Sequence, residues 1–301
     1  MTLHLHLGAH KTATTYIQSR IQQEAQLLKA EGVSYVPVAS FRPWRRQTLS
    51  RAAKKGCGAS RAYFSRFFKR WCPRGCSTLL ISDENMIGTC GNIVRFGRLY
   101  PELTSKLGGV AEMVGDHPVS IYVSIRCYDA FYAAVYCEAL RYDTHCTFTN
   151  FAARLDPTAR RWQHILADIA ILFPESPISV WPYETFRHRE LEIFDRLVGK
   201  SVASRMTLTG DIMRGSMSPK AVEIIETLGQ RVGWFLASRM VPMVEFLVPR
   251  EDESPSFTPW TEHEKHFLRR LYEEDLAIIS ANQRYEFVGC GSVGRSARTC
   301  T

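Results

Sequence analysis

The chain has 301 residues, of which 45% are apolar and 23% are charged, and its formal net charge is +8. This composition is typical of a globular protein with a sizeable core and excludes a disordered or collagen-like chain. No run approaches the roughly 18 apolar residues that a membrane span needs, and no basic and apolar leader opens the chain. We therefore expect a cytoplasmic protein that does not act at a membrane.

Short apolar segments alternate with helical patterns along the chain. The predicted strands are residues 3–7, 33–36, 78–82, 119–125 and 178–181, and the predicted helices are 14–31, 128–142, 159–172, 188–199, 218–233 and 261–281. Strands separated by helices form parallel βαβ units. The sequence therefore predicts one α/β domain over residues 1–301, a three-layer fold with a central parallel sheet, and a flexible tail at about 290–301.

The first strand runs directly into the segment GAHKTATT, residues 8–15. A strand, a tight loop and a helix start bring backbone N–H groups and the positive end of a helix dipole together. Lys11 adds a positive charge. Hydroxyl donors come from Thr12, Thr14 and Thr15. This segment predicts a phosphate or sulfate site, although His10 stands where the P-loop of ATPases needs a glycine before its lysine.

Positive charge gathers in residues 41–76, which hold eleven of the 38 Lys and Arg residues and no Asp or Glu. Such a basic insertion attracts anionic partners. Its aromatic residues follow helical spacing, which favours a helix packed on the core over a nucleic-acid surface. They are Tyr63, Phe64, Phe67, Phe68 and Trp71. We expect no nucleic-acid partner.

Other polar residues point to ordinary structural roles. The nine cysteines lack the spacing of a zinc site, which favours reduced thiols and no metal. His4 and His6 alternate with leucines on the first strand and are expected to be structural. Tyr183 and Glu184 are expected to tie a strand end to neighbouring loops.

Two segments of the chain resemble motifs of a known protein family. The segment GAHKTATTY, residues 8–16, resembles the 5′-phosphosulfate loop of sulfotransferases that use 3′-phosphoadenosine 5′-phosphosulfate (PAPS), with Ala13 in place of a glycine. The segment VSIYVSIRCYDAFYAAVY resembles the family's 3′-phosphate element, in which an arginine is followed eight residues later by a serine. Arg126 matches the arginine, whereas Ala134 stands at the serine position. Softer matches at 179–186, 215–225 and 272–279 follow in the family's order.

The resemblance implies a P-loop-like, bacterial-type sulfotransferase fold. It also implies transfer of a sulfuryl group from PAPS to an acceptor hydroxyl by in-line displacement, with PAP as the product and no metal required. The implied nucleotide-binding residues are Gly8, His10, Lys11, Thr12, Ala13, Thr14, Thr15, Tyr16 and Arg126. Lys11 would stabilise the charge on the leaving phosphate. Tyr16 would either stack on adenine or belong to the core.

The catalytic base is expected just after the third strand, where Asp83 and Glu84 lie at the carboxyl edge of the sheet. A carboxylate within reach of the acceptor hydroxyl can remove its proton. Glu84 is the expected base, and Asp83 and His10 stay open as alternatives. A further alternative is that a carboxylate only caps the following helix at Asn85.

The acceptor is expected to be a carbohydrate or another small or anionic compound, and Arg45 and Arg46 are expected to help bind it. Two other functions stay open. Ala13 and Ala134 would suit a catalytically silent nucleotide-binding protein, whereas the aspartate of the segment SDEN would suit a divergent P-loop kinase or NTPase. The oligomeric state is not predicted.

Overall fold

The computed structural model describes residues 1–41, 57–142, 145–208, 217–249 and 256–289. Six parallel strands form one sheet in the order β2-β3-β1-β4-β5-β6. They are β1 (Thr2–His6), β2 (Val33–Val36), β3 (Thr78–Ser82), β4 (Val119–Ile125), β5 (Ile178–Pro182) and β6 (Tyr285–Phe287). The predicted α/β fold with a central parallel sheet is confirmed, and β6 is an addition to the five predicted strands.

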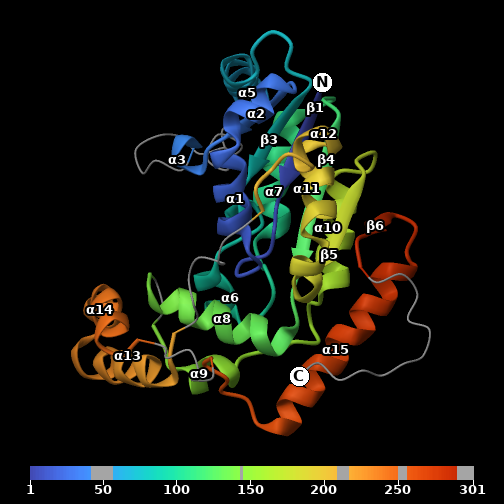
Figure 1. Ribbon diagram of the computed structural model, residues 1–301. Coiled ribbons are helices and arrows are strands. Elements are labelled where there is room, and N and C mark those ends of the chain that lie inside the picture. Colours follow the sequence, from blue (N-terminus) through green and yellow to red (C-terminus); the bar gives the residue numbers. More distant parts are fainter. Residues whose placement is uncertain (42–56, 143–144, 209–216, 250–255, 290–301) are drawn as a thin grey trace.

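Helices cover both faces of the sheet (Figure 1). One face carries α1 (Thr14–Gln23), α2 (Ala25–Ala30), α11 (Glu190–Val198) and α12 (Lys200–Ala203). The other carries α5 (Cys57–Trp71), α6 (Cys90–Phe96), α7 (Leu103–Val114), α8 (Tyr128–Leu140), α10 (Trp162–Leu172) and α15 (Glu262–Ala281). Because alternate residues of a strand face opposite sides, Leu3 and Leu5 pack in the second layer while His4 bonds the Leu197 carbonyl of α11.

The remaining helices are short or lie away from the sheet. They are α3 (Val38–Phe41), α9 (Phe148–Ala152), α13 (Pro219–Val232), α14 (Trp234–Leu247) and the 3-10 helices η2 (Glu84–Met86) and η3 (Tyr183–Arg189). In Figure 1, α13 and α14 form a pair at the lower left. None of the helices in the described ranges has the length and apolar character needed to cross a membrane.

The predicted helix over 14–31 is wrong in one respect, because Glu24 separates α1 from α2. The aromatic stripe of α5 is confirmed as a packed face: Phe64 and Phe67 are buried, and Tyr63, Phe68 and Trp71 pack against the same core. Residues 42–56 of the basic insertion, including Arg45 and Arg46, lie outside the described residues, as does the tail at 290–301.

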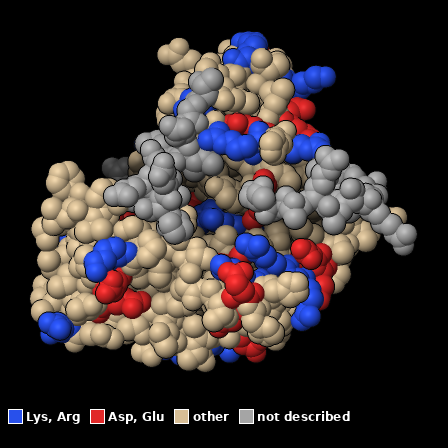
Figure 2. Space-filling model, turned by 60° about the horizontal axis from the view of Figure 1, so that its bottom comes forward, with Lys and Arg blue, Asp and Glu red and all other residues tan. Residues whose placement is uncertain are grey.

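The order of the strands creates a crevice at the carboxyl ends of β1 and β4. These strands are neighbours, yet β1 leads to α1 on one face of the sheet and β4 leads to α8 on the other. Ligands of open parallel sheets bind where two such connections diverge. Figure 2 shows this end of the molecule hollowed between its upper and lower parts, with Lys and Arg side chains gathered around the hollow.

Candidate functional site

The loop that follows β1 continues beside β4 before it enters α1. Leu7 N–H donates to Tyr122 O at 2.9 Å, and Ala9 N–H donates to Ser124 O at 3.1 Å. Lys11 and Ala13 then adopt left-handed backbone conformations, with φ of 63° and 62°. Ala13 is the N-cap residue of α1, and no side chain in the described part of the chain caps the first turn. Alternating left-handed residues and uncapped N–H groups form a concavity suited to an anion.

Gly8 allows this loop to close tightly on the strand. Its φ is 39°, and a Cβ atom there would lie 2.9 Å from Thr14 Oγ1 and 3.2 Å from His6 Nε2. Thr12 Oγ1 and Thr14 Oγ1 donate to Ala9 O at 2.5 and 3.4 Å. Both hydroxyls therefore stabilise the conformation of the loop. Thr15, by contrast, is exposed at the start of α1.

Lys11 pairs with a carboxylate that the sequence did not single out. Its Nζ lies 3.2 Å from Oε2 of Glu138 on α8, and both side chains are largely shielded from solvent. The same carboxylate oxygen lies 3.1 Å from Nη1 of Arg141, whose Nη2 contacts Glu245 of α14. The structure thus shows Lys11 held at the anion concavity by a chain of charges that extends from α8 to α14.

Arg126 is placed beside the loop, at the carboxyl end of β4. Its Nη1 donates to the carbonyl of Lys11 at 2.6 Å, and its guanidinium lies 4.7 Å from the ring centroid of Tyr183. Its Nε is buried and has no hydrogen-bond partner among the described residues. The structure brings together Arg126 and Lys11, as the sequence analysis expected.

Two hydrogen bonds confirm the predicted structural role of Glu184. One carboxylate oxygen accepts from Cys127 N–H at 2.9 Å, at the start of α8, and the other accepts from Tyr272 O–H of α15 at 2.7 Å. Glu184 therefore ties the end of β5 to the helices α8 and α15.

A cavity of about 530 Å³ opens beside the loop, and we call it the acceptor cavity. Its lining residues are His10, Thr15, Gln18, Glu84, Asn85, Thr89, Cys90, Gly91, Glu138, Ala139 and Tyr142. These residues come from the loop and α1, the ends of β3 and α8, and the start of α6. A cavity of this size admits a small organic molecule.

The three candidate bases differ in how they face the acceptor cavity. Glu84 lines it directly. Asp83 is buried outside the lining and accepts a hydrogen bond from Asn85 N–H at 3.0 Å, so it fulfils the capping alternative. Glu84 is therefore the better placed of the two carboxylates.

His10 lines the cavity but is engaged on both ring nitrogens. Burial raises the pKa of Tyr100 well above its ordinary value, so its hydroxyl keeps its proton. This hydroxyl accepts from His10 backbone N–H at 2.9 Å and lies 3.0 Å from His10 Nδ1. His10 Nε2 lies 3.2 Å from Asn85 Oδ1. His10 is thus held by partners on both ring nitrogens, which favours Glu84 as base.

A polar network runs under the loop to Glu84. Gln18 Nε2 donates to Ser82 O at 3.1 Å and lies 3.2 Å from Ser82 Oγ and 3.4 Å from Glu84 Oε2. Ser82 Oγ in turn lies 2.8 Å from His6 Nδ1. Burial lowers the pKa of His6 to about 4, so this histidine is neutral near pH 7.

Tyr16 belongs to the core, which was one of the two alternatives. Only 1% of it is exposed, and it packs edge-on to Phe186 at a ring distance of 6.0 Å. The guanidinium of Arg187 lies 4.6 Å from its ring centroid. This buried position favours a structural role for Tyr16, which packs α1 against the core, over stacking on the adenine of a nucleotide.

Sequence reasoning missed Glu138, Asn85, Gln18 and Tyr100 as parts of this site. Gln18 could have been found, because it lies three residues after Thr15 on the same helical face. Glu138 carries no local signal, since only the packing of α8 beside the loop brings it to Lys11.

No protein-family model and no curated protein matches this chain. Among solved structures, a sulfotransferase from Alicyclobacillus acidocaldarius is similar at 15% sequence identity. The match covers 82% of this chain and 96% of that one, with a TM-score of 0.37. A likeness this distant does not establish what this chain does.

Proposed function

We propose that this protein transfers a sulfuryl group from PAPS to an acceptor hydroxyl. The observation that carries the proposal is the uncapped, left-handed loop over residues 8–15, which holds Lys11 beside Arg126 at the divergence of β1 and β4. The acceptor cavity with Glu84 adjoins this loop. An anion site next to a carboxylate-lined cavity is what transfer of a charged group to a hydroxyl requires.

The residues present fit a bound phosphosulfate nucleotide. The uncapped N–H groups of α1 and the nearby Lys11 would hold the 5′-phosphosulfate. The buried Nε of Arg126, which has no partner among the described residues, would suit the 3′-phosphate. Because Gly8 has no Cβ atom, the loop backbone can lie close to His6 and Thr14, which gives this anion site its shape. PAPS would supply an activated sulfuryl group, whose bond to the phosphate oxygen breaks.

Each residue then has one task. Glu84 accepts the proton of the acceptor hydroxyl, so that its oxygen can form the new S–O bond. Lys11 and the first turn of α1 stabilise the negative charge that stays on PAP. Gln18 and Asn85 orient groups at the cavity wall by hydrogen bonds. The described residues contain no cluster of three or more His, Cys, Asp or Glu side chains that could hold a metal ion.

Calorimetric titration with PAP tests the nucleotide site first. Wild type is expected to bind, and Lys11→Ala and Arg126→Ala are each expected to weaken binding by about tenfold or more, because each removes a charge-assisted contact. Lys220→Ala and Arg270→Ala, at exposed positions on α13 and α15, serve as matched controls.

Transfer of labelled sulfate from PAPS to a panel of sugars then tests the reaction. PAP binding without transfer would favour the silent nucleotide-binding protein, to which Ala134 at the expected serine position points. Absence of PAP binding by the wild type would contradict the proposed function. Magnesium-dependent ATP turnover would instead support a kinase or NTPase.

A further inference from the structure

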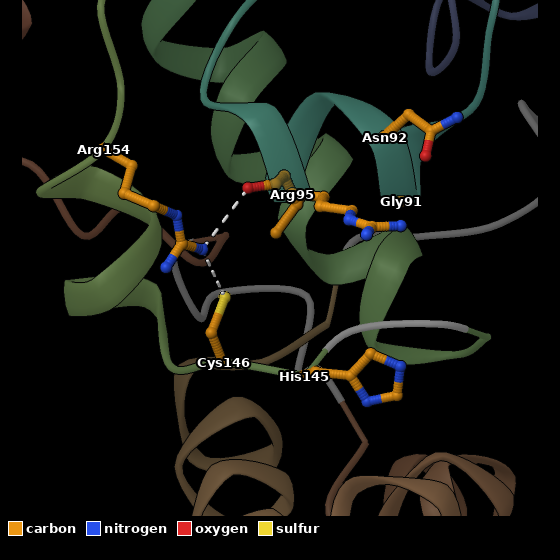
Figure 3. Close-up of a pocket in the computed structure, with 7 residues that line it drawn as sticks. Gly91, Asn92, Arg95, His145, Cys146 and Arg154 are labelled. Carbon is orange, nitrogen blue, oxygen red and sulfur yellow. Dashed lines mark hydrogen bonds between the residues drawn. The ribbon is translucent and has the colours of Figure 1, made fainter.

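A second cavity, of about 580 Å³, lies on the other side of the first turn of α6. We call it the basic cavity, and it is lined by Gly91, Asn92, Val94, Arg95, His145, Cys146 and Arg154. Figure 3 shows Arg154 above Cys146, and Arg95 extending from α6 on the side of His145. No Asp or Glu is among its described lining residues.

Arg154 is held in place at this cavity. Its Nη2 lies 3.0 Å from Cys146 Sγ and 3.5 Å from Val94 O, which accepts a hydrogen bond from it (Figure 3). The remaining N–H groups of a guanidinium can still bind an anion, because the group offers five donors. Two arginines at one cavity predict recognition of a carboxylate, phosphate or sulfate group.

The acceptor cavity has the opposite charge. Glu84 and Glu138 line it, and no Lys or Arg is among its described lining residues. Lys11, which belongs to the loop that would hold the nucleotide, is paired with Glu138. Glu138 is paired with Lys11 and Arg141, so a free anion in this cavity would meet the charges of Glu84 and of the nucleotide phosphates. Uncharged hydroxyl groups would find amide, carboxylate and hydroxyl partners.

The two cavities are adjacent, because Gly91 lines both of them. Both also border the chain that follows α8, through Tyr142 in one and His145 in the other. A ligand that occupies both cavities would pass the first turn of α6 at Gly91. Each cavity has a volume that fits one part of a small organic ligand.

We propose that the acceptor is a polyhydroxylated anion that spans both cavities. Its hydroxyl-bearing unit occupies the acceptor cavity, and its anionic group binds Arg95 and Arg154 in the basic cavity. This inference rests on the proposed function, since it assigns the acceptor of the same reaction. Arg95 and Arg154 are then the residues that select acceptors by charge, without taking part in the chemistry.

Binding of matched disaccharides tests the proposal. The probes are three pairs with gluco, galacto and manno configuration, in which the non-reducing unit carries either CH₂OH or a carboxylate at C6. Binding is measured by calorimetry, with and without PAP, for wild type, Arg95→Gln and Arg154→Gln. Arg98→Gln is the matched control, because Arg98 is exposed, lies near Arg95 in the chain and lines neither cavity.

We expect at least one acidic disaccharide to bind more tightly than its neutral counterpart. Arg95→Gln and Arg154→Gln should each raise its Kd by about threefold or more, while Arg98→Gln leaves it unchanged. Equal binding within every pair, no binding by any pair, or equal effects of all three substitutions would overturn the proposal. Failure of the wild type to bind PAP with the acidic preference intact would count against the proposed function alone.

Discussion

At the scale of single residues, the loop after β1 depends on a conformation that side chains resist. Ala13 has a φ of 62° and is buried, and Lys11 has a φ of 63°. Left-handed backbone costs a residue with a Cβ atom about 1–2 kcal/mol. This strain, next to uncapped N–H groups, is itself a sign of a functional loop.

A substitution series at Ala13 measures this strain. Ala13→Gly is expected to change the free energy of unfolding by less than about 1 kcal/mol, because relief of strain is offset by a more flexible unfolded chain. Ala13→Val is expected to lower it by about 2 kcal/mol or more, since a β-branched side chain resists positive φ. Urea unfolding measures both, with Ala30→Val in the exposed part of α2 as control. Equal effects of valine at both sites would contradict the strained loop.

The ion pair of Glu138 with Lys11 predicts that this carboxylate competes with an anionic ligand. Glu138→Gln is expected to tighten PAP binding several-fold, because the variant removes a negative charge 3.2 Å from the lysine ammonium. Titration with PAP at two salt concentrations measures the effect, which should shrink at high salt. Glu223→Gln, which removes an exposed carboxylate on α13 outside this network, is the control and should leave PAP binding unchanged. Weaker PAP binding by Glu138→Gln would show that the carboxylate is needed to position Lys11.

His6 makes the stability of the fold depend on pH. Its folded pKa of about 4 lies below the unfolded value of 6.5, so only the unfolded chain gains a proton as the pH falls from 6.5 toward 4. The free energy of unfolding therefore has its full value above pH 6.5 and decreases by about 3 kcal/mol as the pH falls from 6.5 to 4. Urea unfolding from pH 4 to 7 should show that His6→Gln loses this part of the pH dependence. An unchanged slope in the variant would exclude His6 as its source.

At the scale of elements, α13 and α14 approach each other closely at Gly229. A Cβ atom on Gly229 would lie 2.4 Å from Cε3 of Trp234. Gly229→Ala is therefore expected to lower the free energy of unfolding by about 1–3 kcal/mol, despite the better helix propensity of alanine.

Gly108 on α7 provides the matched control for this prediction. A Cβ atom there would lie 3.6 Å from Leu172 Cδ2, which is an ordinary contact. Gly108→Ala is expected to stabilise the fold by up to about 1 kcal/mol. Thermal and urea unfolding compare the two variants, and equal effects would mean that α13 and α14 yield to the added methyl group.

Elements with a strong local pattern were predictable from the sequence, and others were not. Five strands and the helices α8, α10, α11, α13 and α15 follow from apolar periodicity. The pattern failed for β6, which has three residues, and for α14, which contains Pro242. It also missed α7, where Gly108 and Gly109 weaken the local helical signal.

At the scale of the whole molecule, the candidate site was predictable only where it follows the strand ends. Lys11, Glu84 and Arg126 all follow parallel strands, which is why the sequence places them together. Glu138, Tyr100 and the basic cavity depend on how α6, α8 and the loops before α9 pack against that edge. Contacts of that kind leave no pattern in a single sequence.

The position of β1 at the centre of the sheet has a consequence for synthesis on the ribosome. β1 is translated before both of its neighbours, β3 and β4, because Leu3 pairs with Leu79 and Val119. Both edges of β1 stay unpaired until most of the first half of the chain has emerged, and exposed strand edges invite aggregation. The loop over residues 8–15 also depends on the synthesis of β4. Ala9 is hydrogen-bonded to Ser124 of β4, and Lys11 is hydrogen-bonded to Arg126, which follows β4. Any ligand of this loop therefore meets a complete site only after β4 has been made.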